Sequence, residues 1–136
     1  MPATSNRVHP SDAIRRLVST PVAEVEQGCT LVEVAAELAA HKIDVVLVRN
    51  AWGVTGLLSE RDLVNQIAAG RDLAAVTAAE AMSTDLVWAH PSTAIVDVAE
   101  LMLKAGIRHL PVGDRRVALG VVSVRDVLGV LVRSSG

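Results

Sequence analysis

The chain repeats itself at a fixed offset of 64 positions, and no other feature of the sequence restricts its possible folds as strongly. Residues 17–64 fall on residues 81–128 without a gap. Many matched positions hold glycine or polar residues: Gly56 with Gly120, Ser59 with Ser123, Arg61 with Arg125, and Asp62 with Asp126. Accidental similarity in a chain rich in alanine and valine would be confined mostly to those two residues. The sequence therefore predicts two copies of one supersecondary unit.

In the first copy, the spacing of apolar residues predicts five elements in the order strand, helix, strand, strand, helix. The capping-box pair Thr30 and Glu33 begins the first helix, and apolar residues follow it at helical intervals. The continuous aliphatic run that comes next is typical of a strand buried on both faces. The expected elements are a strand at 22–25, a helix at about 30–41, strands at 43–48 and 54–58, and a helix at about 59–69.

The second copy repeats this order. Residues 91–93 open its first helix, and Gly106 suits the left-handed position that ends it. Strands are expected at 107–112 and 117–122, followed by a helix at about 123–132. The sequence thus predicts a mixed α/β (α+β) fold made of two β-α-β-β-α units.

Four segments divide the chain. Residues 1–16 are expected to form an N-terminal arm with a short helix, 17–70 the first repeat, 71–80 a connector, and 81–133 the second repeat. Thr77 and Glu80 form another capping-box pattern, which predicts a helical connector that holds the two repeats close together.

Composition excludes several classes of protein. Hydrophobic residues make up 51% of the 136 positions, but no run approaches the ~18 apolar residues of a membrane span. A net charge of −2 argues against attraction of the whole surface to nucleic acid or anionic lipid. The start lacks the pattern of a secretory signal, so the cytoplasm is the expected location. Because monomers rarely expose large apolar patches, the apolar surplus also favours a homodimer.

Cys29 is the only cysteine, so the chain can form no intramolecular disulfide and has no paired-cysteine metal motif. Its position beside a helix start could lower the thiol pKa. No nucleophile elbow, Walker loop or HExxH pattern occurs, and the sequence therefore offers no starting point for an enzyme mechanism.

Two eight-residue motifs share the pattern G-h-h-S-x-R-D-h, where h is apolar: residues 56–63 and 120–127. Together with the central-strand pattern at 107–112 and the order of elements, they resemble a tandem pair of cystathionine-β-synthase-type (CBS) domains, a Bateman module. The resemblance covers about residues 17–132. It implies two repeats packed by their sheets about a pseudo-twofold axis, with two clefts that take adenosine-containing ligands such as AMP, ADP, ATP or S-adenosylmethionine. It implies a regulatory rather than catalytic protein that needs no cofactor.

The family's ligand contacts can be carried over residue by residue. One implied cleft combines Ser59, Arg61 and Asp62 with Thr84, Asp85, Leu86, Arg108, His109, Leu110 and Pro111. The other combines Ser123, Arg125 and Asp126 with Thr20, Pro21, Val22, Asp44, Val45 and Val46. The chain departs from the family pattern at Asp85, which stands where Pro21 stands in the first repeat, and at Leu47, which stands where Pro111 stands in the second. These departures affect ligand preference rather than the fold.

The residue types fit this chemistry. Asp62 and Asp126 can each accept hydrogen bonds from the two vicinal hydroxyls of a ribose, and a serine at a helix start can meet a phosphate oxygen. Arg108 and His109 favour phosphate in the first cleft, whereas Asp44 at the matching position would repel it. The Asp62 cleft is therefore expected to bind nucleotide phosphates, and the Asp126 cleft to be weak, empty or occupied by a less charged adenosine compound.

Plainer interpretations stay open. The Ser-x-x-Asp pattern also serves simply to cap a helix, and Arg108 and His109 could be surface residues beside a buried run. The main alternative function is a ligand-free module for dimerisation or protein-protein interaction. A more remote alternative is a nucleic-acid binder that uses the Arg108 cleft and the basic pair Arg15 and Arg16. The sequence does not identify the regulated partner.

Overall fold

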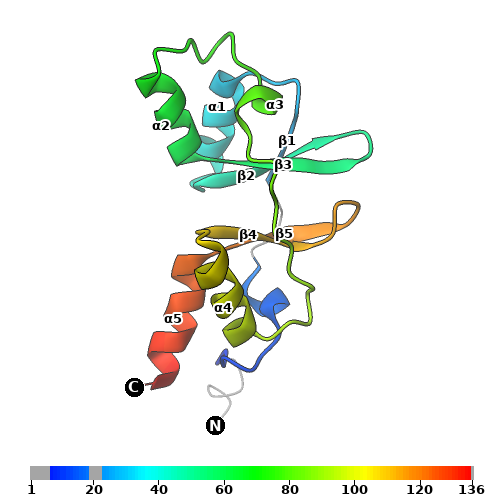
Figure 1. The fold of residues 1–136 in the computed structure, drawn as a ribbon, viewed down its shortest axis with the longest axis vertical. Coiled ribbons are helices and arrows are strands. Elements are labelled where there is room, and N and C mark those ends of the chain that lie inside the picture. The colour runs from blue at the N-terminus through cyan, green and yellow to red at the C-terminus, as the bar shows by residue number, and fades with distance from the viewer. Residues whose placement is uncertain (1–6, 19–22, 136) are drawn as a thin grey trace.

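A computed structural model describes residues 7–18 and 23–135. Two similar halves follow one another, as the internal repeat predicts (Figure 1). The elements are the 3-10 helix η2 (Ile14–Leu17), β1 (Glu24–Glu26), α1 (Leu31–His41), β2 (Val45–Asn50), β3 (Gly53–Ser59), α2 (Glu60–Ala68), α3 (Ala78–Ala81), α4 (Ile95–Ala105), β4 (His109–Gly113), β5 (Ala118–Ser123) and α5 (Val124–Ser135). The mixed α/β fold with two related units is confirmed.

The first unit is a three-stranded sheet covered by helices on one face. Strand β1 pairs in parallel with β2, and β2 pairs antiparallel with β3. Val46 and Val48 pack with α1 and α2, whereas Leu47, between them, points to the opposite face and packs with Val54 and Leu57. Strand β2 is therefore buried on both faces, which explains its continuous aliphatic sequence.

The second unit has a shorter sheet than the sequence suggests. Strands β4 and β5 form an antiparallel hairpin, but the expected first strand is reduced among the described residues to one parallel bridge between Ala89 and Val112. This bridge is the counterpart of the pairing between Val25 and Val48, again at an offset of 64. Pro91 follows two residues later and has no backbone N–H to continue the ladder.

The two sheets face each other in the middle of the molecule, and the helices lie outside them (Figure 1). Side chains of both units fill the space between the sheets: Leu47, Val54, Leu57, Trp88, Ala118 and Val121. The hairpins of the two units also touch, because the Val54 N–H donates to the Arg115 carbonyl at 2.9 Å. Gly53 has φ +141°, and a Cβ there would overlap that carbonyl oxygen. This contact fixes how closely the hairpins approach.

The N-terminal segment crosses over to the second unit. Ile14 is fully buried in the core of that unit, with Val98 and Met102 among its neighbours. Its N–H donates to the Thr93 carbonyl at 2.8 Å. In Figure 1 the blue N-terminal helical segment accordingly lies beside α4. The segment that precedes the first unit in the sequence thus completes the core of the second.

The connector between the repeats likewise completes the core of the first unit. Ala78, at the start of α3, is fully buried in the first core, and its N–H donates to the Cys29 carbonyl at 2.8 Å. These positions lie 64 residues from Ile14 and Thr93, so the two short helices are equivalents. Thr77 and Glu80 form the expected capping box at the start of α3.

Candidate ligand-binding groove

A single groove of about 1410 Å³ runs between the two units. Its walls come from the starts of α2 and α5, from the residues just before β2 and β4, and from the segment that follows α3. The sequence suggested two related clefts, and the structure joins them into one continuous space. Asp62 and Arg108, which belong to different units, line this same space.

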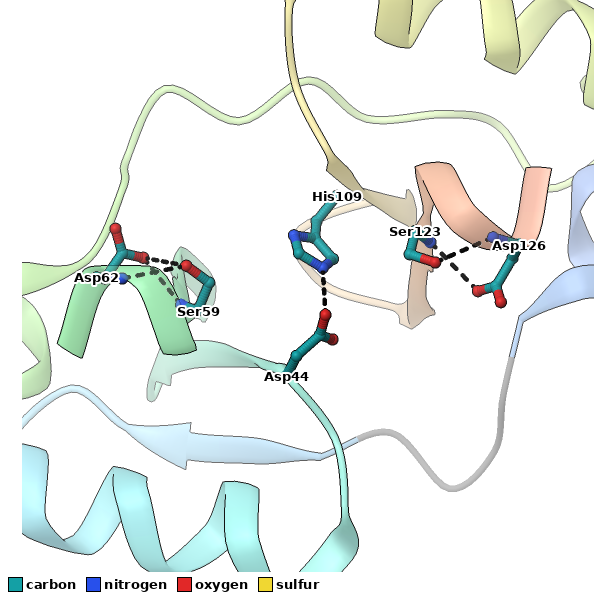
Figure 2. A network of polar contacts seen from close by, with 6 residues as sticks. All are labelled: Asp44, Ser59, Asp62, His109, Ser123 and Asp126. Atoms are coloured by element: carbon teal, nitrogen blue, oxygen red, sulfur yellow. Dashed lines mark hydrogen bonds and ion pairs between the residues drawn. The ribbon is translucent and has the colours of Figure 1, made fainter. Parts of the chain in front are cut away.

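Ser59 and Asp62 stand at one end of the groove, at the start of α2 (Figure 2). Oδ2 of Asp62 accepts hydrogen bonds from the Ser59 backbone N–H at 2.8 Å and the Ser59 hydroxyl at 3.1 Å. The Asp62 N–H donates back to the Ser59 hydroxyl oxygen at 3.3 Å. Capping thus occupies one carboxylate oxygen, while Oδ1 accepts no hydrogen bond from the described residues. The side chain can cap the helix and meet a ligand at the same time.

Ser123 and Asp126 occupy the matching place at the start of α5 (Figure 2). Their capping contacts are fewer and include a longer one: Ser123 N–H to Asp126 Oδ2 at 3.4 Å, and Asp126 N–H to the Ser123 hydroxyl oxygen at 3.1 Å. Asp126 is also more exposed than Asp62. The second carboxylate is therefore held less firmly than the first.

Asp44 and His109 meet between these two helix starts. His109 Nε2 lies 3.2 Å from Asp44 Oδ2, and Figure 2 shows the imidazole reaching across to the carboxylate from the opposite unit. The His109 side chain is 16% exposed and the Asp44 side chain 57%. A protonated or Nε2–H imidazole donates to the carboxylate and reduces its repulsion of an anionic ligand.

Arg108 and Asp44 are equivalents under the 64-residue offset, and their backbones behave alike. The Arg108 carbonyl accepts from the Val124 N–H at 2.8 Å, and the Asp44 carbonyl accepts from the Glu60 N–H at 2.9 Å. The Arg108 side chain is exposed in the groove wall and makes no ion pair with the described residues. One end of the groove therefore carries a free guanidinium where the other carries a carboxylate.

The remaining expected site residues fall into four groups. Those that line the groove are Arg61, Asp85, Leu86, Pro111, Val45 and Arg125. The side chains of Leu110 and Val46 are buried in the two cores, so only their backbones could meet a ligand, and Thr84 is exposed outside the lining. Thr20, Pro21 and Val22 lie outside the described residues.

Sequence reasoning missed Lys42, which lines the groove next to Asp44. It ends α1 in the left-handed conformation, with φ 54° and ψ 45°. Among the described residues it is the one non-glycine with positive φ, and its equivalent in the second unit is Gly106. The repeat alignment contains this signal, because it matches a lysine with a helix-ending glycine. A residue kept in a costly backbone conformation at a groove wall is a candidate functional residue.

Other candidate residues take structural roles or lie elsewhere. Trp88 packs between the sheets, whereas Trp52 is 86% exposed at the tip of the first hairpin. Burial raises the pKa of the Cys29 thiol, and the neighbouring Glu33 adds to the effect, so the lowered pKa suggested by the helix start is wrong. The described residues contain no cluster of His, Cys, Asp or Glu suited to a metal ion, and none of their helices is long and apolar enough to cross a bilayer.

Comparison with known proteins gives a consistent family. The sequence model of the CBS domain matches residues 14–69 and again residues 78–133. The CBS domain-containing protein YhcV of Bacillus subtilis is 30% identical over 116 residues, which cover 85% of this chain and 82% of YhcV. A crystal structure of a CBS-domain-containing protein from Agrobacterium tumefaciens aligns with a TM-score of 0.78 and 30% identity, covering 89% of this chain and 94% of that one. A CBS domain protein from Pyrobaculum aerophilum, solved in complex with AMP, aligns with a TM-score of 0.78 and 25% identity, covering 90% and 98% of the two chains.

Proposed function

Because this chain belongs to the CBS-domain family and carries two CBS domains in tandem, we propose that it is a non-catalytic regulatory module that binds an adenine nucleotide in the groove between them. The observation that carries this proposal is the placement of Asp62 and Arg108. A helix-start carboxylate of one unit and a free guanidinium of the other face the same groove. The similar protein from Pyrobaculum aerophilum, whose structure holds AMP, supports the choice of ligand.

Ribose recognition is assigned to the carboxylate of Asp62. Its Oδ1 has no partner among the described residues, and the capping bonds from Ser59 hold the group in place. A carboxylate can accept hydrogen bonds from both vicinal hydroxyls of a ribose, as in dinucleotide-binding folds. A group held in position before the ligand arrives loses little entropy on binding.

Phosphate recognition is assigned to the basic residues of the groove. Arg108 and Lys42 both line the groove, and the start of α2 adds the positive end of a helix dipole. Guanidinium groups form strong, forked hydrogen bonds with phosphate. This combination favours AMP or another adenine nucleotide over uncharged adenosine compounds in the groove.

Calorimetric titration of AMP, ADP, ATP and S-adenosylmethionine into the purified protein tests the proposal. AMP is expected to bind, and Asp62→Asn to weaken it about tenfold or more, because asparagine can still cap the helix through its oxygen but loses the charged acceptor. Glu80→Gln is the matched control, since it alters another capping-box acid outside the groove. Equal affinity of wild type and Asp62→Asn would contradict the assignment.

A thermal melt gives an independent measurement. A ligand present at ~100 times its dissociation constant adds about 2.7 kcal/mol to the free energy of unfolding, enough to raise Tm by several degrees. If none of the four ligands raises Tm or gives a binding heat, the groove is not an adenine nucleotide site.

Dimerisation without ligand is the second candidate, and exposed apolar side chains favour it. Val64 on α2 is 60% exposed, and its equivalent Leu128 on α5 is 51% exposed. Matching apolar positions on the two units suit an isologous contact with a second copy of the chain. Sedimentation velocity of wild type and of Val64→Lys with Leu128→Lys tests this: the wild type is expected to sediment as a dimer and the double variant as a monomer.

A further inference from the structure

A second hollow lies beside the groove, between the N-terminal segment and α5. Its volume is about 510 Å³, and three arginines line it: Arg16, Arg125 and Arg133. We propose that this arginine pocket binds linked phosphate groups, either the di- or triphosphate tail of a nucleotide seated at Asp126 or a free inorganic polyphosphate. The nucleotide form rests on the proposed function, whereas the polyphosphate form does not.

The charge of the pocket favours an anion with several charges. Arg16 is paired with Asp12, Nη1 to Oδ2 at 2.6 Å, and Asp126 contributes the one acidic group of the lining. Arg125 and Arg133 form no ion pair with the described residues. Two uncompensated guanidinium groups and a third that can be shared therefore face a space several times larger than one phosphate group. Guanidinium groups bind phosphate oxygens in a forked geometry, which suits a chain of phosphates.

A glycine gives Arg133 its place in the pocket. Gly129 lies one helical turn before Arg133 on α5, and a Cβ at residue 129 would come within 3.1 Å of Arg133 Nη1. The guanidinium thus lies along the bare backbone of Gly129. A larger side chain there would displace it, so Gly129 and Arg133 act as one feature.

The first unit lacks this pocket chemistry, although its backbone is built in the same way. Under the 64-residue offset, Arg16 corresponds to Glu80, and Arg133 corresponds to Ala69. Glu80 is used in the capping box of α3. Of the three arginines, Arg125 alone has an arginine, Arg61, at the equivalent position of the first unit. The basic cluster is therefore a property of the second unit and not a by-product of the repeat.

The pocket adjoins the Asp126 end of the groove. Arg125 and Asp126 line both spaces. A ribose held by Asp126 could consequently extend its phosphates toward Arg16 and Arg133. This arrangement would let the Asp126 end prefer a nucleotide with more phosphates than the ligand of the Asp62 end.

Titration calorimetry with tripolyphosphate, AMP and ATP tests the pocket on the full chain. Arg133→Gln and Arg16→Gln are each expected to weaken ATP or tripolyphosphate binding about tenfold, as loss of a charge-assisted hydrogen bond implies. AMP binding at the Asp62 end should stay within about twofold. Arg115→Gln is the matched control, because this exposed arginine lies on the second hairpin, outside both spaces. Circular dichroism melts verify that each variant folds.

The outcomes separate the two ligand sources. Weakened ATP binding without tripolyphosphate binding supports a nucleotide tail, and weakened binding of both supports a general polyphosphate site. If AMP does not bind the wild type, the proposed function is contradicted. The tripolyphosphate titration would still decide whether the arginine pocket binds linked phosphates. The pocket is refuted if neither ATP nor tripolyphosphate binds, or if both bind Arg133→Gln and Arg16→Gln as tightly as the wild type.

Discussion

His109 Nε2 lies 3.2 Å from Asp44 Oδ2, and this contact joins the two CBS repeats across the middle of the groove. The sequence assigned the two residues to different clefts, one favouring phosphate and the other repelling it. Their direct contact means that a residue expected to favour phosphate and one expected to repel it partly neutralise each other. A ligand that binds next to Asp44 and His109 either displaces the contact between them or adds further contacts between the two repeats.

Replacing Asp44 by asparagine is expected to tighten AMP binding about fivefold at low salt. The substitution keeps an oxygen for His109 but removes a negative charge from the groove, and a unit charge about 4 Å away in water contributes about 1 kcal/mol. Titration calorimetry in buffers of low and high salt measures the change, which screening should reduce. Asp97→Asn is the control, because Asp97 is exposed on α4 and lies outside the groove. An unchanged affinity would show that bound phosphate lies far from Asp44.

Lys42→Gly is expected to stabilise the protein by about 1 kcal/mol while it weakens nucleotide binding. Glycine adopts the left-handed conformation found at residue 42 without steric cost, whereas loss of the lysine removes a charge from the groove wall. Urea unfolding and titration calorimetry with AMP measure the two effects. Gly106→Ala, at the equivalent helix end, provides the reverse control and should cost about 1 kcal/mol. Stabilisation without loss of affinity would exclude Lys42 from binding.

Gly53→Ala is expected to destabilise the protein by about 2 kcal/mol or more. Residue 53 has φ +141°, and its position against the Arg115 carbonyl leaves no room for a methyl group. The hairpins would have to separate, so nucleotide affinity should fall together with the free energy of unfolding. Gly28→Ala serves as the comparison, because a Cβ there meets nothing within 4 Å. Equal urea midpoints for the two variants would rule out a tight hairpin junction.

Cys29 is expected to react slowly with iodoacetamide at neutral pH. Burial, with help from Glu33, raises the pKa of its thiol above the ordinary value, so little thiolate is present. The same shift links stability to pH. The contribution is present below the pKa of the unfolded thiol and is lost as the pH rises through the higher pKa of the folded thiol. Alkylation rates between pH 7 and pH 10 check the direction, and Cys29→Ser should remove the corresponding pH dependence of unfolding.

The repeat made much of this fold predictable. Local patterns were sufficient for the helix starts at Thr30 and Ser59, because capping residues are close together in the sequence. They also predicted strand β2, although at 43–48 rather than at its observed position, Val45–Asn50. The offset of 64 then transferred these features to the second unit. The shortened first strand of that unit was not expected, because the sequence pattern does not show how many backbone hydrogen bonds form between strands before Pro91.

Long-range geometry accounts for what the sequence did not reveal. The contact between Asp44 and His109 depends on how two sheets stack, and no spacing along the chain encodes it. The placement of Ile14 in the opposite core is equally non-local. The motif residues Ser59, Asp62, Ser123 and Asp126 do line one groove, but their role in binding stays a prediction.

The exchange of short helices between the halves limits how the chain can be divided. A cut in the loop before α3 would leave the C-terminal fragment without Ile14 and the N-terminal fragment without Ala78, each of which is wholly buried in the core of the opposite fragment. Neither fragment could complete its own hydrophobic core, but each would contain the buried residue that the core of the other fragment lacks. The halves are therefore expected to be unstable alone and to reassemble when mixed, so the repeats melt as one cooperative body rather than as two domains.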